Sequence, residues 1–330
     1  MAMHSNQPFG RTLGVIAILI LLLCYQLAGC RQQVSTAPSL VQDEVVIATP
    51  SPNTDSVVDN PQTLADRWVV SAHEADQMIE KGATVLDARG GLFTVRLPGA
   101  TAVDWRAFSP TERAIRGTLL SDDSALGEKI RALGVSNDRP VVVFGNPLRG
   151  WGEEGRIVWM LRSLGHSQAV MVDGGIRAIK ESGISIPSST PVIGDFEVDR
   201  RSTWSIQRDE LKDRLQTESI ALIDSRELRE FSGSTPYGEQ RGGHVPGAVH
   251  LYFKDLLDAD GRLLPKQEIV RKLAALGITS EERIVVYCTG GIRSGWLTAV
   301  LVSIGFQSQN YAGSMWEWSA SPAANYPLES

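Results

Sequence analysis

Two segments of the 330-residue chain resemble each other, and this internal repeat constrains the possible folds more than any other feature. Residues 85–89 (VLDAR) match residues 222–226 (LIDSR), and residues 97–100 (LPGA) match residues 245–248 (VPGA). Three further pairs follow, namely 131–135 with 274–278, 141–144 with 284–287, and 164–165 with 304–305. The order is the same in both segments, and the offset stays between 137 and 148 residues. Each segment is therefore one copy of a domain of roughly 120–130 residues, a usual domain size.

Each copy alternates short β-branched runs with amphipathic stretches, which predicts alternating strands and helices. The expected strands cover residues 84–86, 141–144 and 169–172 in the first copy and 221–223, 284–287 and 309–311 in the second. Helices are expected over 126–133 and 269–276, each ended by the glycine that follows it, and Ser71 with Glu74 forms a capping-box pattern that opens the first helix. This alternation predicts an α/β fold in which each copy has a mostly parallel sheet covered by helices on both faces.

The overall composition excludes several classes of protein. Hydrophobic residues make up 42% of the chain and charged residues 21%, which is usual for a soluble globular protein and excludes a disordered chain, a collagen and a polytopic membrane protein. The net charge of −6 gives no sign of the basic surface that nucleic-acid binding requires, so we expect no nucleic-acid partner. Three cysteines are too few for a disulfide scaffold.

The first 29 residues have the pattern of an export signal. Residues 13–25 are almost wholly apolar, which is short for a membrane span of about 20 residues but suits the hydrophobic region of a secretory signal. The following residues 27–30 (LAGC) resemble the lipobox of bacterial lipoproteins, in which the signal is cleaved before a lipidated cysteine. We therefore expect lipidation at Cys30 and an exported protein anchored on the periplasmic or another extracytoplasmic face of a membrane. The alternative is a signal that is kept as an uncleaved anchor helix.

Between this signal and the repeat lies a predicted flexible tether. Residues 30–66 are rich in Ser, Thr, Pro, Asn and Asp and show no sustained apolar period. We place the two domains at residues 67–190 and 191–330. After cleavage of the signal and lipidation of Cys30, Cys288 would be the only free thiol, and no intramolecular disulfide would be possible.

The residues with the clearest chemistry lie in the second copy, directly after the expected strand 284–287. The loop 288–293 (CTGGIR) joins this strand to a helical stretch, residues 295–303. The glycines allow the loop to turn its N–H groups inward, and the helix start and Arg293 add positive potential. Each effect lowers the pKa of the Cys288 thiol, as a nucleophile requires. The alternative is a buried, inert cysteine beside an unrelated arginine.

The repeated region, residues 68–326, resembles the tandem rhodanese (thiosulfate/mercaptopyruvate sulfurtransferase) family. The resemblance is carried by residues 224–226 (DSR), 243–248 (GHVPGA), the loop 288–293, and Gly313-Ser314 with Glu317-Trp318. It implies that Cys288 takes a sulfane sulfur from a small-molecule donor, becomes a persulfide and passes the sulfur to a small-molecule acceptor, without a cofactor or metal. In the same way it implies that the backbone of Thr289, Gly290, Gly291 and Ile292 cradles the persulfide and that Arg293 holds the anion.

Two further arginines are candidate substrate contacts. Arg226 belongs to the DSR motif, although a buried ion pair with Asp224 is an equal alternative. Four residues after that arginine the eukaryotic two-domain enzymes have a substrate-binding Arg, but this chain has Glu230, with Arg229 beside it. This departure puts the usual substrate contacts in doubt.

The first copy lacks the catalytic residues and is predicted to be inactive. Gly145 occupies the position that corresponds to Cys288, and the loop after it is longer. This copy can still wall a cleft between the domains. Arg149 or Arg156 is able to reach such a cleft, but a solvated or salt-bridged arginine is the favoured interpretation. Since the two copies already provide an internal interface, we expect a monomer.

These observations predict a lipid-anchored thiosulfate sulfurtransferase of the rhodanese type, with cyanide or a thiol as acceptor. One alternative is a persulfide carrier or redox-sensing module at the membrane that does not turn over. Phosphatase or arsenate reductase activity is less favoured, because related phosphatases have five residues between Cys and Arg whereas this loop has four.

Overall fold

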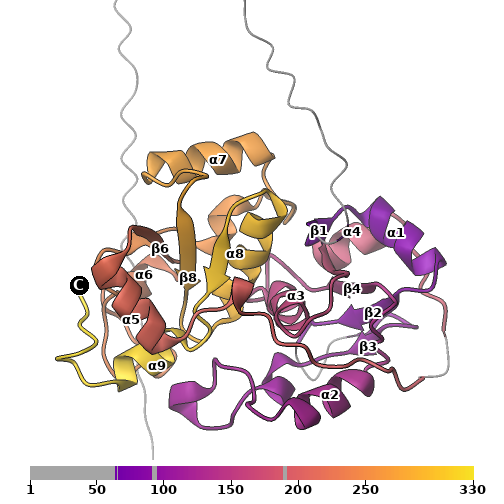
Figure 1. Cartoon of the computed structure of the whole chain (residues 1–330). Helices are drawn as coiled ribbons and strands as arrows, with labels where there is room; N and C mark the ends of the chain where they lie inside the picture. Colours follow the sequence, from indigo (N-terminus) through magenta and orange to yellow (C-terminus); the bar gives the residue numbers. More distant parts are fainter. Residues whose placement is uncertain (1–63, 65, 91–94, 189–191) are drawn as a thin grey trace, which may run out of the picture. The chain divides into compact units, whose positions relative to one another are not determined.

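The computed structural model describes residue 64 and residues 66–90, 95–188 and 192–330 (Figure 1). The predicted signal peptide, Cys30 and nearly all of the predicted tether lie outside these residues. Among the helices that the described residues form, none has the length and apolar character needed to cross a bilayer.

The first copy builds a five-stranded sheet in which every neighbouring pair is parallel. Its strand order is β1-β5-β4-β2-β3. The strands are β1 (Val69–Val70), β2 (Thr84–Asp87), β3 (Thr101–Ala102), β4 (Val141–Phe144) and β5 (Ala169–Val172). The central strands β4 and β5 are buried along their whole length, as expected for a parallel sheet covered on both faces.

The second copy builds a four-stranded parallel sheet with the order β7-β6-β8-β9. Its strands are β6 (Ile220–Asp224), β7 (Val249–His250), β8 (Arg283–Tyr287) and β9 (Ser308–Asn310). Asp224 pairs with Tyr287 at the carboxyl ends of β6 and β8. The residues that follow these strands therefore meet at one edge of the sheet, where ligands of α/β proteins usually bind.

Helices cover both faces of each sheet. In the first copy they are α1 (Ala72–Glu80), α2 (Asp123–Arg131), α3 (Glu153–Ser163) and α4 (Gly175–Glu181). In the second copy they are α5 (Arg208–Thr217), α6 (Leu228–Phe231), α7 (Lys266–Ala275), α8 (Ile292–Ser303) and α9 (Ser314–Ala320). Four short 3-10 helices complete the described elements, namely η1 (Trp105–Phe108), η2 (Arg113–Ile115), η3 (Ser202–Trp204) and η4 (Phe253–Leu256).

Alternate residues of each strand enter different cores, which shows directly that the sheets are covered on both sides. In β4, Val142 packs with α1 and α4, whereas Val143 packs in the core that contains α2 and α3. In β8, Val285 packs with α5 and α9, whereas Val286 joins α7 and α8. The predicted fold class is confirmed: an α/β fold with parallel sheets flanked by helices.

The predicted element boundaries agree closely with the structure. The capping box of Ser71 and Glu74 is present at α1, and the two glycines expected to end α2 and α7, Gly134 and Gly277, have positive φ angles. The last strand, expected over 309–311, lies one residue earlier. The sequence analysis missed the two-residue strands β1, β3 and β7, which are too short to show a period of two. The division of the chain at residue 190 stays a prediction.

Helices α3 and α8 pack against each other and join the two copies (Figure 1). The contact is close because each helix has a glycine at the crossing. A Cβ atom on Gly155 would lie 2.4 Å from the Cα atom of Trp296, and one on Gly295 would lie 3.2 Å from the Cα atom of Arg156. Arg156 and Trp296 thus occupy equivalent places on the two helices, and each lies against the opposite copy.

In the first copy, a buried carboxyl group fills the place that corresponds to the Cys288 side chain. A Cβ atom on Gly145 would lie 1.9 Å from Oε2 of Glu154. Glu154 is 1% exposed, and neither carboxyl oxygen has a hydrogen-bond partner among the described residues. Burial, with a smaller contribution from the charge of Glu153, raises the pKa of Glu154 to about 7.

Replacement of Glu154 by Gln should therefore change how the stability depends on pH. A carboxyl pKa that is raised on folding stabilises the fold at low pH, and this contribution is lost as the pH rises from about 4.5 to about 7. A change of this size corresponds to roughly 3 kcal/mol in the free energy of unfolding. We expect wild-type protein to lose up to that amount between pH 5 and pH 8 in urea titrations, and Glu154→Gln to lose much less. Glu128→Gln, at an exposed position on α2, is the control, and a pH dependence unchanged in Glu154→Gln would contradict the prediction.

Candidate active site around Cys288

The Cys288 loop joins the end of β8 to the start of α8. Cys288 follows Tyr287 directly, and Gly291 is the N-cap of α8 with a φ of 81°. A Cβ atom on Gly291 would lie 2.5 Å from the carbonyl oxygen of Ala312, so a glycine is needed both for the backbone conformation and for space. Helix α8 begins three residues earlier than the sequence pattern indicated, so its N-terminal turn lies beside the loop.

The Cys288 thiol is 1% exposed and surrounded by hydrogen-bond donors. The N–H of Gly291 donates to Sγ over 3.1 Å, and the Ser294 hydroxyl lies 3.5 Å from Sγ. Burial alone raises the pKa of Cys288, but the Arg293 guanidinium and the hydrogen bonds from Ser294 and the loop outweigh it, so the pKa is lower than that of an ordinary thiol. Within the described part of the chain, this cysteine is unpaired. The loop therefore favours a thiolate, as the sequence analysis predicted.

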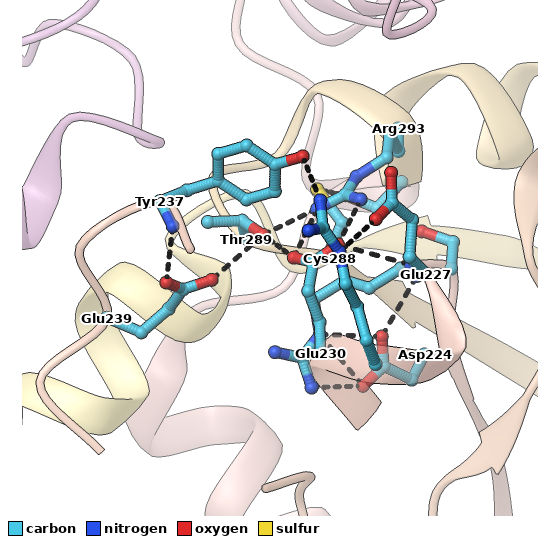
Figure 2. A network of polar contacts seen from close by, with 12 residues as sticks. Asp224, Glu227, Glu230, Tyr237, Glu239, Cys288, Thr289 and Arg293 are labelled. Carbon is cyan, nitrogen blue, oxygen red and sulfur yellow. Dashed lines mark hydrogen bonds and ion pairs between the residues drawn. The ribbon is translucent and has the colours of Figure 1, made fainter. Parts of the chain in front are cut away.

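Arg293 lies beside the sulfur, but its charge is already neutralised. Both terminal guanidinium nitrogens donate to the carboxylate of Glu230, over 2.6 and 2.8 Å, and Nη2 also donates to the Thr289 hydroxyl over 2.5 Å (Figure 2). Arg293 and Glu230 are both buried. Burial raises the pKa of Glu230, but the hydrogen bonds from Arg293 overcompensate and lower it. The pair therefore contributes little net charge to the site.

The sequence analysis treated Glu230 only as a departure from a substrate-binding arginine and missed its contact with Arg293. The two residues are 63 positions apart in the chain. Only the pairing of β6 with β8, which brings α6 next to the Cys288 loop, places them together.

A cavity of about 170 Å³ opens over Cys288. Outside the Cys288 loop its wall is mainly aromatic, and it comes from both copies of the repeat. The lining side chains outside the loop are Trp105, Arg106, Trp151, Glu153, Tyr237 and Trp316, and the loop itself contributes Cys288, Thr289, Gly290, Ile292 and Arg293. Besides Cys288, four of the five predicted loop residues thus reach the cavity, and Gly291 donates its N–H to Sγ.

The two other predicted substrate contacts lie outside this wall. Arg226 has no exposed surface, since its guanidinium binds Asp224 over 2.6 Å and the carbonyl of Gly243 over 2.8 Å. The structure therefore corrects its predicted role in substrate binding in favour of the buried ion pair with Asp224. Arg229 has an exposed side chain that donates to Glu227 and to the Tyr237 hydroxyl, and its contact with substrate stays a prediction.

The surroundings of Arg156 differ from the favoured prediction. The favoured interpretation was a solvated or salt-bridged side chain, but Arg156 is 1% exposed and has no ion pair with a described carboxylate. Its guanidinium reaches across from α3 to the carbonyl oxygen of Gly291 in the Cys288 loop. No local sequence pattern distinguishes this arginine from an exposed one, because its partner is 135 residues away.

The chemistry that this arrangement supports is nucleophilic. A buried thiol of lowered pKa faces a small cavity, and N–H groups of a loop and a helix start are available for an anion. Among the described residues, no cluster of three or more His, Cys, Asp or Glu side chains could hold a metal ion.

Comparison with known proteins identifies relatives of this chain. The family model of the rhodanese-like domain matches residues 207–321. The chain is 30% identical over 235 residues to a probable 3-mercaptopyruvate sulfurtransferase of Pseudomonas aeruginosa, covering 68% of this chain and 82% of that protein. It is 29% identical over 272 residues to the putative thiosulfate sulfurtransferase SseB of Mycobacterium tuberculosis, covering 77% and 94%.

A solved structure shares the fold. The anaerobic ergothioneine biosynthesis enzyme from Chlorobium limicola superposes with a TM-score of 0.67 at 20% identity, covering 80% of this chain and 70% of that one. At this identity the likeness concerns the fold alone. The sequence relatives and the family model go further: the chain belongs to the rhodanese family of sulfurtransferases.

Proposed function

We propose that this sulfurtransferase moves sulfane sulfur from thiosulfate to a thiophilic acceptor, such as cyanide or a thiol, through a persulfide on Cys288. The observation that carries the proposal is the buried Cys288 thiol, whose lowered pKa and N–H neighbours favour an anionic sulfur at the base of a small cavity. The same surroundings suit the persulfide anion, which places its charge one sulfur atom further out.

The proposed reaction has two steps. In the first, the Cys288 thiolate attacks the outer sulfur of thiosulfate. A new S–S bond forms at Cys288, the S–S bond of thiosulfate breaks, and sulfite leaves with the electron pair. In the second, cyanide attacks the terminal sulfur of the persulfide. A C–S bond forms, the S–S bond to Cys288 breaks, thiocyanate leaves, and the thiolate is restored.

The names of several relatives support thiosulfate as the donor. The chain is 28% identical to thiosulfate sulfurtransferases of Azotobacter vinelandii and Corynebacterium glutamicum. We assign the cradle of the transferred sulfur to the backbone of residues 289–292, and the neighbouring cation to Arg293. Since Glu230 neutralises Arg293, the anionic donor must also rely on the N–H groups of the loop and the α8 N-terminus.

The location of the activity is part of the proposal. A lipid on Cys30 and a tether over residues 30–66 would hold the catalytic body near a membrane on its extracytoplasmic side. In this account residues 191–330 form the catalytic domain of a monomer, and residues 67–190 form a domain without a nucleophile.

A sulfur carrier is the second candidate. The chain is 30% identical over 243 residues to the sulfur carrier protein TtuD of Thermus thermophilus, covering 68% of this chain and 82% of that protein. A carrier loads once with sulfur and releases it to a protein partner, whereas an enzyme cycles with small acceptors.

Replacement of Cys288 by Ser tests the proposal. With thiosulfate and cyanide in excess, we expect the wild-type protein to form thiocyanate over many turnovers and Cys288→Ser to form none above background, because a hydroxyl cannot accept the sulfur. Circular dichroism should show an unchanged fold. Activity retained by Cys288→Ser would refute the assigned nucleophile, and a wild-type protein that releases at most one equivalent of thiocyanate would favour the carrier.

Replacement of Glu230 by Gln tests the balance of charge at the site. The substitution leaves the buried Arg293 without its counter-charge, so we expect the free energy of unfolding to fall by roughly 3 kcal/mol. The same uncompensated cation should lower the pKa of the Cys288 thiol, which is measured from the pH dependence of its alkylation. Glu227→Gln is the control, because it removes a nearby carboxylate that binds the exposed Arg229 and not Arg293. It should change neither the free energy of unfolding nor the thiol pKa appreciably. A thiol pKa that rises in Glu230→Gln would contradict the argument.

A further inference from the structure

Arg156 of α3 belongs to the first copy but lies directly behind the Cys288 loop of the second. Its Nη1 donates to the carbonyl oxygen of Gly291 over 3.4 Å, and its Nη2 donates to the carbonyl oxygen of Gly117 over 2.8 Å. Gly291 is also the residue whose N–H faces the sulfur of Cys288. Gly291 thus accepts a hydrogen bond from Arg156 at its carbonyl oxygen and donates one to Sγ of Cys288 from its N–H.

The space behind the loop is closed tightly around this contact. A Cβ atom on Gly291 would lie 2.9 Å from Nη1 of Arg156, and a Cβ atom on Gly117 would lie 3.0 Å from the backbone of Gly290. The Asn310 amide donates to the same carbonyl of Gly291 over 3.3 Å. The first copy therefore fixes the loop from behind, through Arg156 and the chain around Gly117.

Arg156 differs from Arg293 in its charge balance. Glu230 neutralises Arg293, whereas no carboxylate in the described part of the chain forms an ion pair with Arg156. The other contacts of Arg156 are neutral, namely backbone carbonyls, the Ser109 hydroxyl and the ring of Trp159, 4.5 Å from the guanidinium carbon. A buried cation without an anion is strongly unfavourable. The anion that interacts with it is the thiolate of Cys288.

The electrostatics of Arg156 agree with this pairing. Burial lowers the pKa of Arg156 to about 9, and the negative charge of Cys288 partly offsets this decrease. Other charged groups near the Cys288 loop are Arg293 on α8, Glu230 on α6, Glu239, which accepts a hydrogen bond from the Thr289 hydroxyl, and Arg106 and Glu153 of the first copy, which line the cavity. Arg293 is paired with Glu230 and Arg106 with Asp104, so Arg156 differs from both in having no carboxylate partner among the described residues.

We propose that Arg156 is a positioning residue of the sulfur-transfer reaction, which holds the Cys288 loop and supplies the buried positive charge that stabilises the thiolate and then the persulfide. The role in the persulfide step rests on the proposed function of Cys288, but the effect on the thiolate does not. The copy of the repeat without a nucleophile thus completes the site of the other copy.

Arg162 provides a matched control on the same helix. It is also 1% exposed, donates to the backbone carbonyls of Ala169 and Arg67 over 2.8 and 2.9 Å, and lies over the ring of Trp68 at 5.2 Å. Its hydrogen bonds to described residues lie within the first copy, whereas Arg156 donates to the Cys288 loop. A substitution there tests the loss of a buried arginine from α3 without changing the surroundings of the thiol.

The experiment compares Arg156→Gln, Arg156→Lys and Arg162→Gln in the full-length protein. The rate of Cys288 alkylation by iodoacetamide is measured against pH to obtain the thiol pKa, and the rate of thiocyanate formation from thiosulfate and cyanide is measured in parallel. Gln retains a hydrogen-bond donor but no charge, and Lys retains the charge. We expect Arg156→Gln to raise the thiol pKa by about one unit, which makes alkylation roughly tenfold slower well below both pKa values. Arg156→Lys should stay close to wild type, and Arg162→Gln should reduce thermal stability without moving the thiol pKa.

A folded Arg156→Gln protein with the wild-type thiol pKa would overturn the proposal. An Arg156→Lys protein whose thiol pKa rises by a unit or more would also overturn it, and this variant decides the matter if Arg156→Gln does not fold. Failure of the proposed function has a different signature, because sulfur transfer would then persist in Cys288→Ser.

Discussion

The burial of the Cys288 sulfur directly after β8 is the constraint on which the rest of this structure depends. Cys288 is almost completely withdrawn from solvent, which by itself disfavours the thiolate that sulfur transfer requires. The surrounding structure compensates in three ways. The N–H of Gly291 donates to the sulfur, the first turn of α8 begins beside it, and buried guanidinium groups approach it from two helices. Each of these interactions with the sulfur depends on the position of the Cys288 loop. The packing that holds the loop in place therefore also determines the properties of the thiol.

The two copies of the repeat share one backbone arrangement but hold different side chains at equivalent places. Helices α3 and α8 occupy equivalent places in the two copies, and glycines at their crossing bring the backbones together. In the second copy the space after the central strand holds a thiol. In the first copy the carboxyl group of Glu154 fills the corresponding space beside Gly145, with its pKa raised by burial. The first copy thus holds a carboxyl group where the second holds a thiol, while Arg156 on its α3 helix donates to the carbonyl oxygen of Gly291 in the Cys288 loop.

Much of this architecture could be predicted because its signals are local. The runs 141–144 and 284–287 are continuous β-branched segments, the glycines after α2 and α7 adopt the conformation that ends a helix, and the loop between Cys288 and Arg293 is contiguous in the sequence. The parts that sequence reasoning missed are long-range. The pairing of Glu230 with Arg293 depends on the register of β6 and β8, and the approach of Arg156 to Gly291 depends on the crossing of α3 and α8. For Arg226 the sequence left substrate contact and a buried ion pair as equal alternatives, and only the fold, which buries it against Asp224, distinguishes them.

The most direct test of the account is the mass of the full-length protein after incubation with thiosulfate, before and after the addition of cyanide. The account predicts a gain of one sulfur atom, located on the peptide that contains Cys288, and its removal by cyanide with repeated turnover. A protein that gains no sulfur from thiosulfate, or that gains it on a peptide without Cys288, would contradict the account.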